Sequence, residues 1–174
     1  MSGNNKEIEV KILEIDQEKI IDKLRSLGAK KIFEGEVEAT FLKNDHLDKN
    51  HTLRVRKVGE KVELCFKGKS EESKFKIKEE LEVITDNYLQ TIKIFDRLGF
   101  KESFHIKKRR ESYHLGKVKF EIDTYPGIPT FLEIEAPSEE EVEEAVKKLG
   151  YTLEDTKNYS AKQLFKHYGK DKTA

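Results

Sequence analysis

Apolar and charged residues alternate with a period of two along most of the chain, which is the pattern of strands with one apolar and one charged face. The alternation predicts about eight strands. They cover residues 7–12, 31–42, 53–58, 61–67, 78–83, 103–114, 117–123 and 131–135. Short turns with a glycine, at Val58-Gly59-Glu60 and Leu115-Gly116-Lys117, join consecutive strands and favour an antiparallel sheet.

Three segments change to the 3.6-residue period of an amphipathic helix, and each of them ends in Leu-Gly. These segments are residues 16–28, 85–99 and 138–150. A glycine just past the last periodic leucine is a common C-terminal cap. Asp16, Thr85 and Ser138 stand where an N-cap is expected, and Glu141 follows Ser138 at the spacing of a capping box. Helices and antiparallel strands in this order predict an α+β protein.

The length of 174 residues fits a single domain, and 36% hydrophobic residues are enough to form its core. We expect this domain to cover residues 1–168, with a disordered tail at 169–174 and a mobile, charge-rich loop at 67–78. The single cysteine, Cys65, excludes an internal disulfide. The chain has no apolar run of signal-peptide length and none near the roughly 20 residues that span a bilayer, so we expect a cytoplasmic protein without a membrane partner.

Charged residues make up 39% of the chain, but 34 basic and 34 acidic side chains cancel. No net field therefore draws the protein to nucleic acid or anionic lipid, and any basic site must be local. The signs are distributed unevenly among the strands. Carboxylates concentrate at Glu7, Glu9, Asp123, Glu133 and Glu135, and cations at Arg54, Arg56, Lys67 and residues 107–110.

Two interpretations of the charged faces are open. A half-buried antiparallel sheet shows polar residues to water, which explains the alternation without any function. Alternatively, the sheet closes into a barrel of roughly eight antiparallel strands with helices packed outside, and the charged faces line its interior. The apolar side chains that would then face the helices include Ile8, Val10, Val55, Ile122 and Ile134.

A charged interior predicts ligands, because clustered carboxylates repel one another and unpaired buried charge is strongly disfavoured. Mg²⁺ or Mn²⁺ would compensate the carboxylates, since hard divalent cations prefer oxygen ligands. The five or six Lys and Arg side chains would match the roughly four negative charges of a triphosphate, whose oxygens suit the planar guanidinium group.

Five motifs in order resemble the CYTH superfamily of triphosphate tunnel metalloenzymes, over about residues 6–165. They are E-x-E-x-K at Glu7 to Lys11, L-R-x-R at Leu53 to Arg56, a strand that ends at Lys67, K-x-R before Tyr113, and F-x-E-I-E at Phe131 to Glu135. The superfamily includes class IV adenylyl cyclases, thiamine triphosphatases and inorganic triphosphatases, and this chain is most similar to the small prokaryotic class IV cyclase-like branch.

The resemblance implies a role for each matching residue. The implied metal ligands are Glu7, Glu9, Asp123, Glu133 and Glu135, with Asp123 either next to the metal or ordering a basic partner. The implied phosphate-binding residues are Lys11, Arg54, Arg56, Lys67, Lys108 and Arg110, and the implied catalytic residues are Glu9, Glu135 and Lys11. Alternation alone lets either pair of the run 107–110 point inward, and the K-x-R spacing of the family selects Lys108 and Arg110. Glu80 and Glu82 either line the interior or lie at its mouth as solvated charge.

The expected activity is metal-dependent chemistry on a small-molecule triphosphate, by a monomer or homodimer. Hydrolysis of inorganic tripolyphosphate or of a nucleoside or thiamine triphosphate is favoured, because no residues that would form an adenine pocket can be named. Cyclisation of ATP to cyclic AMP and pyrophosphate is the alternative, and a module that binds polyphosphate or nucleotide without turnover is a third option. The run 107–110 is a weak sign of nucleic-acid binding, which the zero net charge disfavours.

Other chemistries have little support in the sequence. The five histidines show no zinc-ligand spacing, and no glycine-rich phosphate-binding loop is present. Cys65 lies between Leu64 and Phe66 on a strand, which indicates a packing or interior-lining residue rather than a nucleophile.

Overall fold

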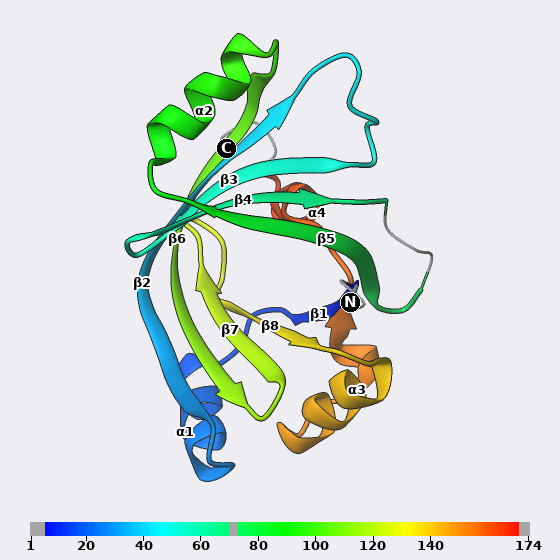
Figure 1. Cartoon of the computed structure of the whole chain (residues 1–174). Helices are drawn as coiled ribbons and strands as arrows, with labels where there is room; N and C mark the ends of the chain where they lie inside the picture. The colour runs from blue at the N-terminus through cyan, green and yellow to red at the C-terminus, as the bar shows by residue number, and fades with distance from the viewer. Residues whose placement is uncertain (1–5, 70–72, 171–174) are drawn as a thin grey trace, which may run out of the picture.

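The strands close into a barrel with helices outside it (Figure 1). The computed structural model describes residues 6–69 and 73–170, and the side chains of residues 6 and 7 lie outside the described part. The strands are β1 (Lys6–Ile12), β2 (Lys30–Lys43), β3 (Thr52–Val58), β4 (Lys61–Lys67), β5 (Lys76–Thr85), β6 (Lys101–Leu115), β7 (Val118–Thr124), β8 (Phe131–Ala136) and the short β9 (Thr156–Lys157). The helices are α1 (Gln17–Ser26), α2 (Tyr88–Arg97), α3 (Glu139–Lys148) and α4 (Ala161–His167), with a 3₁₀ turn at Leu153–Asp155.

Every strand of the barrel is antiparallel to its neighbours, in the order β5-β4-β3-β2-β6-β7-β8-β1. The ring closes because the first half of β1 also pairs with β5, with Ile8 opposite Ile77 and Glu9 opposite Lys76. The second half of β1 pairs with β9 on the same edge. The predicted closed antiparallel barrel is therefore confirmed.

The apolar sides of the strands face the helices, as the alternation predicted. Val10 and Ile134 are fully buried in the largest apolar cluster, together with Leu24 of α1 and Val146 of α3. A second cluster places β3 and β4 under α2, which lies across the molecule from α1 and α3 (Figure 1). In a third cluster Leu164 of α4 packs with residues of β2, β6 and β8. This third cluster lies on the inward side, where Ala39 and Leu164 line the interior. Elsewhere the charged sides of the strands are turned into the barrel.

Local capping agrees with two of the three predicted helix starts. The side chains of Asp16 and Ser138 accept hydrogen bonds from the backbone N–H groups of Lys19 and Glu141. The prediction for Thr85 was wrong, because this residue ends β5 and the Asn87 side chain caps α2.

Two segments differ from the sequence-based expectation. The predicted loop at 67–78 is shorter, since Lys67 ends β4 and β5 already begins at Lys76, while residues 70–72 lie outside the described part. Helix α4 was not predicted, although Ser160 and Gln163 form a capping box at its start. Residues 169 and 170 of the expected tail continue from α4 by backbone hydrogen bonds, and residues 171–174 are not described.

Of the helices in the described ranges, none has both the length and the apolar character that crossing a membrane would require.

Candidate functional site

A cavity of about 690 Å³ occupies the interior of the barrel. Its described lining contains ten Lys or Arg and seven Glu side chains, and the buried Asp123 behind them reduces the positive excess from three to two. The inward side of β2 is apolar, with Val37, Ala39 and Phe41 in the lining. A polyanion is therefore the class of ligand that this interior suits best.

The acidic side of the cavity is built by β1 and β8. Glu9 lies opposite Glu135, and Lys11 lies opposite Glu133, in the antiparallel register of these strands. Directly opposite residues place their Cβ atoms about 5 Å apart, so the carboxylates crowd together. The Lys11 Nζ separates two of them, 3.0 Å from Glu9 Oε1 and 2.9 Å from Glu133 Oε2. The Lys76 ammonium contacts the same Glu9 oxygen from across the β1–β5 seam.

The ionisation of these carboxylates differs with their neighbours. Burial alone would raise the pKa of Glu9, but Lys11 and Lys76 lower it well below its ordinary value. Burial raises the pKa of Glu135 above its ordinary value even though Lys119 Nζ lies 2.6 Å from its Oε1. Glu9 is thus held as a carboxylate, whereas Glu135 takes up a proton more readily, as a general base does.

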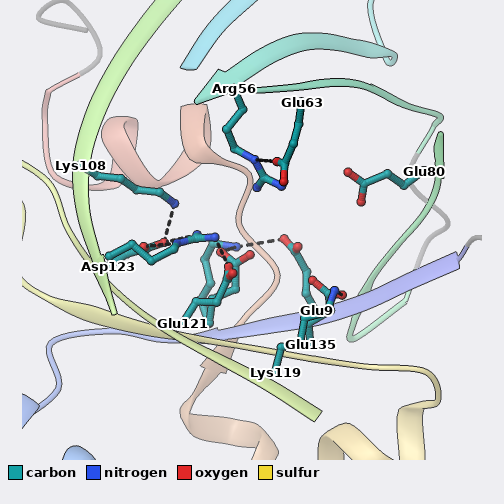
Figure 2. A network of polar contacts seen from close by, with 12 residues as sticks. Glu9, Arg56, Glu63, Glu80, Lys108, Lys119, Glu121, Asp123 and Glu135 are labelled. Carbon is teal, nitrogen blue, oxygen red and sulfur yellow. Dashed lines mark hydrogen bonds and ion pairs between the residues drawn. The ribbon is translucent and has the colours of Figure 1, made fainter. Parts of the chain in front are cut away.

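Beside β8 in the ring, Lys108 and Arg110 of β6 converge on Asp123 of β7. Figure 2 shows the contact between Lys108 and Asp123. Arg110 donates from Nε and Nη2 to the two Asp123 oxygens at 2.7 and 2.6 Å, and Lys108 Nζ lies 2.6 Å from Oδ2. Burial would raise the pKa of Asp123, but these two cations lower it to about 2. Burial and the neighbouring Arg110 lower the pKa of Lys108 to about 8. Asp123 thus orders two basic partners, which is one of the two roles that the resemblance implied.

Strands β3, β4 and β5 supply the remaining cations. Arg56 Nε lies 2.5 Å from Glu63 Oε2, and Lys67 Nζ lies 3.1 Å from Glu80 Oε2. The Nε and Nη2 atoms of Arg54 are buried without a hydrogen-bond partner among the described residues. The nearest carboxylate oxygen in an ion pair with Arg54 is Glu80 Oε1, at 3.9 Å.

The structure brings nearly all of the predicted site residues to one cavity. The lining includes Glu9, Lys11, Arg54, Arg56, Lys67, Lys108, Arg110, Glu133 and Glu135. Both Glu80 and Glu82, whose position the sequence left open, also line it. The side chain of Glu7 lies outside the described part, so its role stays a prediction.

Several charged residues of the interior were missed by the sequence reasoning. They are Lys61, Glu63, Lys76, Lys78, Lys119 and Glu121. Each stands an even number of residues from a predicted inward position on the same strand, and this parity was the signal that could have found them. Because of these residues, positively and negatively charged side chains alternate more closely around the cavity than the sequence suggested.

Cys65 is buried on the inward side of β4, where its Sγ donates to Glu80 Oε1 at 2.6 Å. Burial and this hydrogen bond raise the pKa of its thiol to about 12. A thiol that stays protonated is a poor nucleophile, so the structure agrees with a packing or interior-lining role.

Among the side chains that the structure describes, those of residues 8–69 and 73–170, no three from His, Cys, Asp or Glu form a group that could hold a metal ion. Glu9, Glu133 and Glu135 are each engaged by a lysine instead.

This arrangement, a closed barrel with an interior of facing carboxylates and cations, corresponds to a known family. The family model for the CYTH domain matches residues 5–166. The chain therefore belongs to the CYTH family, which confirms the resemblance inferred from its motifs.

Individual relatives agree with this assignment. A protein of Methanocaldococcus jannaschii, named as a putative adenylate cyclase, is 31% identical over 132 residues, which are 74% of this chain and 75% of the relative. The solved structure of the PH1012 protein from Pyrococcus horikoshii has 30% identity and a TM-score of 0.79, and covers 91% of this chain and 98% of its own. A second solved structure is of a Hippeastrum protein, described as a putative adenylyl cyclase with a dominant triphosphatase activity. It has 16% identity and a TM-score of 0.64, and the match covers 93% of this chain and 95% of its own. At this identity the likeness shows the shared fold.

Proposed function

We propose that this protein is a divalent-metal-dependent phosphohydrolase that cleaves a triphosphate bound inside the barrel. The observation that carries the proposal is the Arg54 guanidinium group, whose buried Nε and Nη2 have no hydrogen-bond partner in the described part of the chain. A buried unpaired donor is costly unless a ligand satisfies it, and phosphate oxygens match the planar guanidinium fork. The excess of positive charge in the lining supports the same class of ligand.

The donor chemistry of the β1 and β8 carboxylates suits a hard divalent cation, although the described side chains are held in ion pairs with lysines rather than as a ready group of metal ligands. Glu9, Glu133 and Glu135 supply only oxygen donors from neighbouring strand positions, and Glu7 would extend the set. Mg²⁺ or Mn²⁺ held there would neutralise negative charge that develops on the transferred phosphoryl group.

The other residues bind and orient the triphosphate. Lys11, Arg54, Arg56, Lys67, Lys108 and Arg110 surround the cavity from several strands, so they hold the phosphates along its length. Asp123 fixes the positions of Lys108 and Arg110. Glu135, with its raised pKa, accepts a proton from the attacking water.

Cyclisation of ATP is the second candidate, because the relative with 31% identity is named as a putative adenylate cyclase. Hydrolysis is favoured since cyclisation also needs a fixed ribose and adenine, and among the described residues we identify no set of polar groups that would select that base. The triphosphatase activity in the description of the Hippeastrum protein is compatible with this preference. A binding module without turnover would not need the Glu9 and Glu135 carboxylates, so it is the least favoured.

The test is a substrate panel of tripolyphosphate, ATP and thiamine triphosphate with Mg²⁺ or Mn²⁺, in which released phosphate and cyclic AMP are measured together. We expect phosphate release that Glu9→Gln almost abolishes, and that Glu36→Gln, an exposed change outside the cavity, leaves intact. Cyclic AMP as the main product would establish the cyclase instead. Tight binding of tripolyphosphate with neither product would establish the binding module.

A further inference from the structure

Lys76 is a charged residue of the interior to which the site chemistry above gives no role of its own. It begins β5 and lies directly opposite Glu9 where β5 and β1 close the barrel. Its side chain is 15% exposed and lines the cavity, and its ammonium group contacts Glu9 Oε1. The Lys11 ammonium contacts the same oxygen, so one carboxylate oxygen is shared by two cations.

Among the described side chains, two ammonium groups meet at one oxygen of Glu9. Lys11 bridges Glu9 and Glu133, at 3.0 and 2.9 Å, so two carboxylates face two ammonium groups. A divalent cation on the same Glu9 oxygen would lie close to both ammonium groups in a buried environment. Close like charges in such an environment repel strongly, so an ammonium group must withdraw when the cation binds.

The contacts indicate which ammonium group withdraws. Lys11 is held by two carboxylates, one on β1 and one on β8. The ion pair of Lys76 in this cluster is with Glu9. Lys76 therefore gives up fewer contacts than Lys11 if it leaves, and its position in the cavity lining lets its flexible stem turn toward a bound anion.

We propose that Lys76 is the built-in counter-ion of the metal-free site: it occupies the Glu9 oxygen that a divalent cation takes, and it withdraws when that cation binds. This inference rests on the metal dependence in the proposed function. It makes Lys76 a competitor of the metal and a positioning residue rather than a ligand. The carboxylates consequently stay paired in both states.

The experiment is a calorimetric titration of Mn²⁺ into the substrate-free protein, which measures the affinity for Mn²⁺. Loss of the competing ammonium group in Lys76→Met should tighten Mn²⁺ binding by at least about tenfold, because breaking a buried pair leaves Glu9 undercompensated. Lys76→Arg keeps the positive charge and should stay within about threefold of wild type. Lys61→Met is the matched control, since it removes one cavity-lining cation that pairs with Glu63 and Glu82 instead, and it should change the affinity by less than about threefold.

Thermal denaturation of the same variants provides a second readout. Lys76→Met should melt below wild type in chelator, and saturating Mn²⁺ should raise its melting temperature more than that of wild type. Lys76→Gln, which retains a hydrogen-bond donor, replaces Lys76→Met if the latter does not fold, and the same direction is expected.

Equal or weaker Mn²⁺ binding by Lys76→Met, with clear binding by wild type, would overturn the inference and leave the proposed function in place. Equal tightening in Lys61→Met and Lys76→Met would also overturn it, because the effect would then be one of total charge. If neither wild type nor Lys76→Met binds Mn²⁺, the metal dependence of the proposed function fails, and the inference fails with it.

Discussion

Replacement of Asp123 by asparagine tests how much the buried ion cluster contributes to the stability of the barrel. Asp123 is fully buried and receives two hydrogen bonds from Arg110 and one from Lys108. Asparagine has nearly the same shape but no charge, so the two cations lose their shared carboxylate in the interior. Glu121 still contacts Arg110, which limits the damage on one side.

Two independent estimates give the size of the effect. The pKa of Asp123 falls from 3.8 to about 2, and at about 1.4 kcal/mol per unit this corresponds to roughly 2.5 kcal/mol at neutral pH. Removing one member of a buried ion pair typically costs about 3–5 kcal/mol. We therefore expect Asp123→Asn to lose about 3 kcal/mol of unfolding free energy.

Thermal and urea denaturation measure this loss. For a chain of this length, about 3 kcal/mol lowers the melting temperature by roughly 6–12 °C. Glu82→Gln is the control, because its carboxylate is 30% exposed and its ion pairs with Arg56 and Lys61 are 3.4 and 3.6 Å long. It should cost less than about 1 kcal/mol. An Asp123→Asn protein that unfolds within about 1 kcal/mol of wild type would refute the reasoning.

The same cluster gives the stability a defined pH dependence. Because the folded-state pKa of Asp123 is lowered, its contribution is complete above the unfolded value and is lost as the pH falls from about 4 through about 2. Asp123→Asn should lack this part of the acid transition, which a comparison of unfolding free energies at pH 5 and pH 2.5 would detect. If Asp123→Asn loses as much stability between pH 5 and pH 2.5 as wild type, other carboxylates cause the acid transition.

Three further predictions concern the ligand and the core. The kcat/KM for tripolyphosphate should fall as the pH rises through about 8, because Lys108 loses its proton there, and Lys108→Arg should remove this step from the pH profile. Arg54→Met should weaken tripolyphosphate binding by at least about tenfold, while its melting temperature without ligand stays within a few degrees of wild type. An unchanged dissociation constant would contradict the phosphate-binding role given to the Arg54 nitrogens that lack a hydrogen-bond partner. Leu24 is fully buried where α1 packs on the barrel, so Leu24→Ala should lose about 2–5 kcal/mol of unfolding free energy in a denaturation experiment. Calorimetry should find the tripolyphosphate affinity of the folded variant unchanged.

Alternation was sufficient to predict the strands and their charged faces, whereas the closed barrel was one of two open interpretations and was favoured by the resemblance to the CYTH superfamily. Alternation assigned Val10 to the outer core and Glu9 to the interior, because side chains of a strand point to opposite faces with a fixed period of two. Motif spacing selected Lys108 and Arg110 out of a run of four cations, and both line the cavity. These features depend on one strand at a time.

Features that depend on how distant segments meet were not predictable in the same way. Lys76 reaches Glu9 only through the register of the β1–β5 seam, and the alternation on either strand does not contain that register. The pairing of Asp123 with two cations follows from the register of β6 and β7 together. Helix α4 has only seven residues, too few for a clear helical period, and its burial depends on contacts with β8 and β2.

The position of β1 between β8 and β5 has a consequence for how the chain reaches its native state. Residues 8–12 cannot complete their pairing until residue 136 has been synthesised, so β1 waits for a partner that lies more than 100 residues later in the chain. Contacts across such long sequence separations typically slow folding to milliseconds or seconds. During that interval the unpaired strand exposes its backbone edge and its apolar side chains. Nascent chains that stop before β8 should therefore depend on chaperones to avoid aggregation.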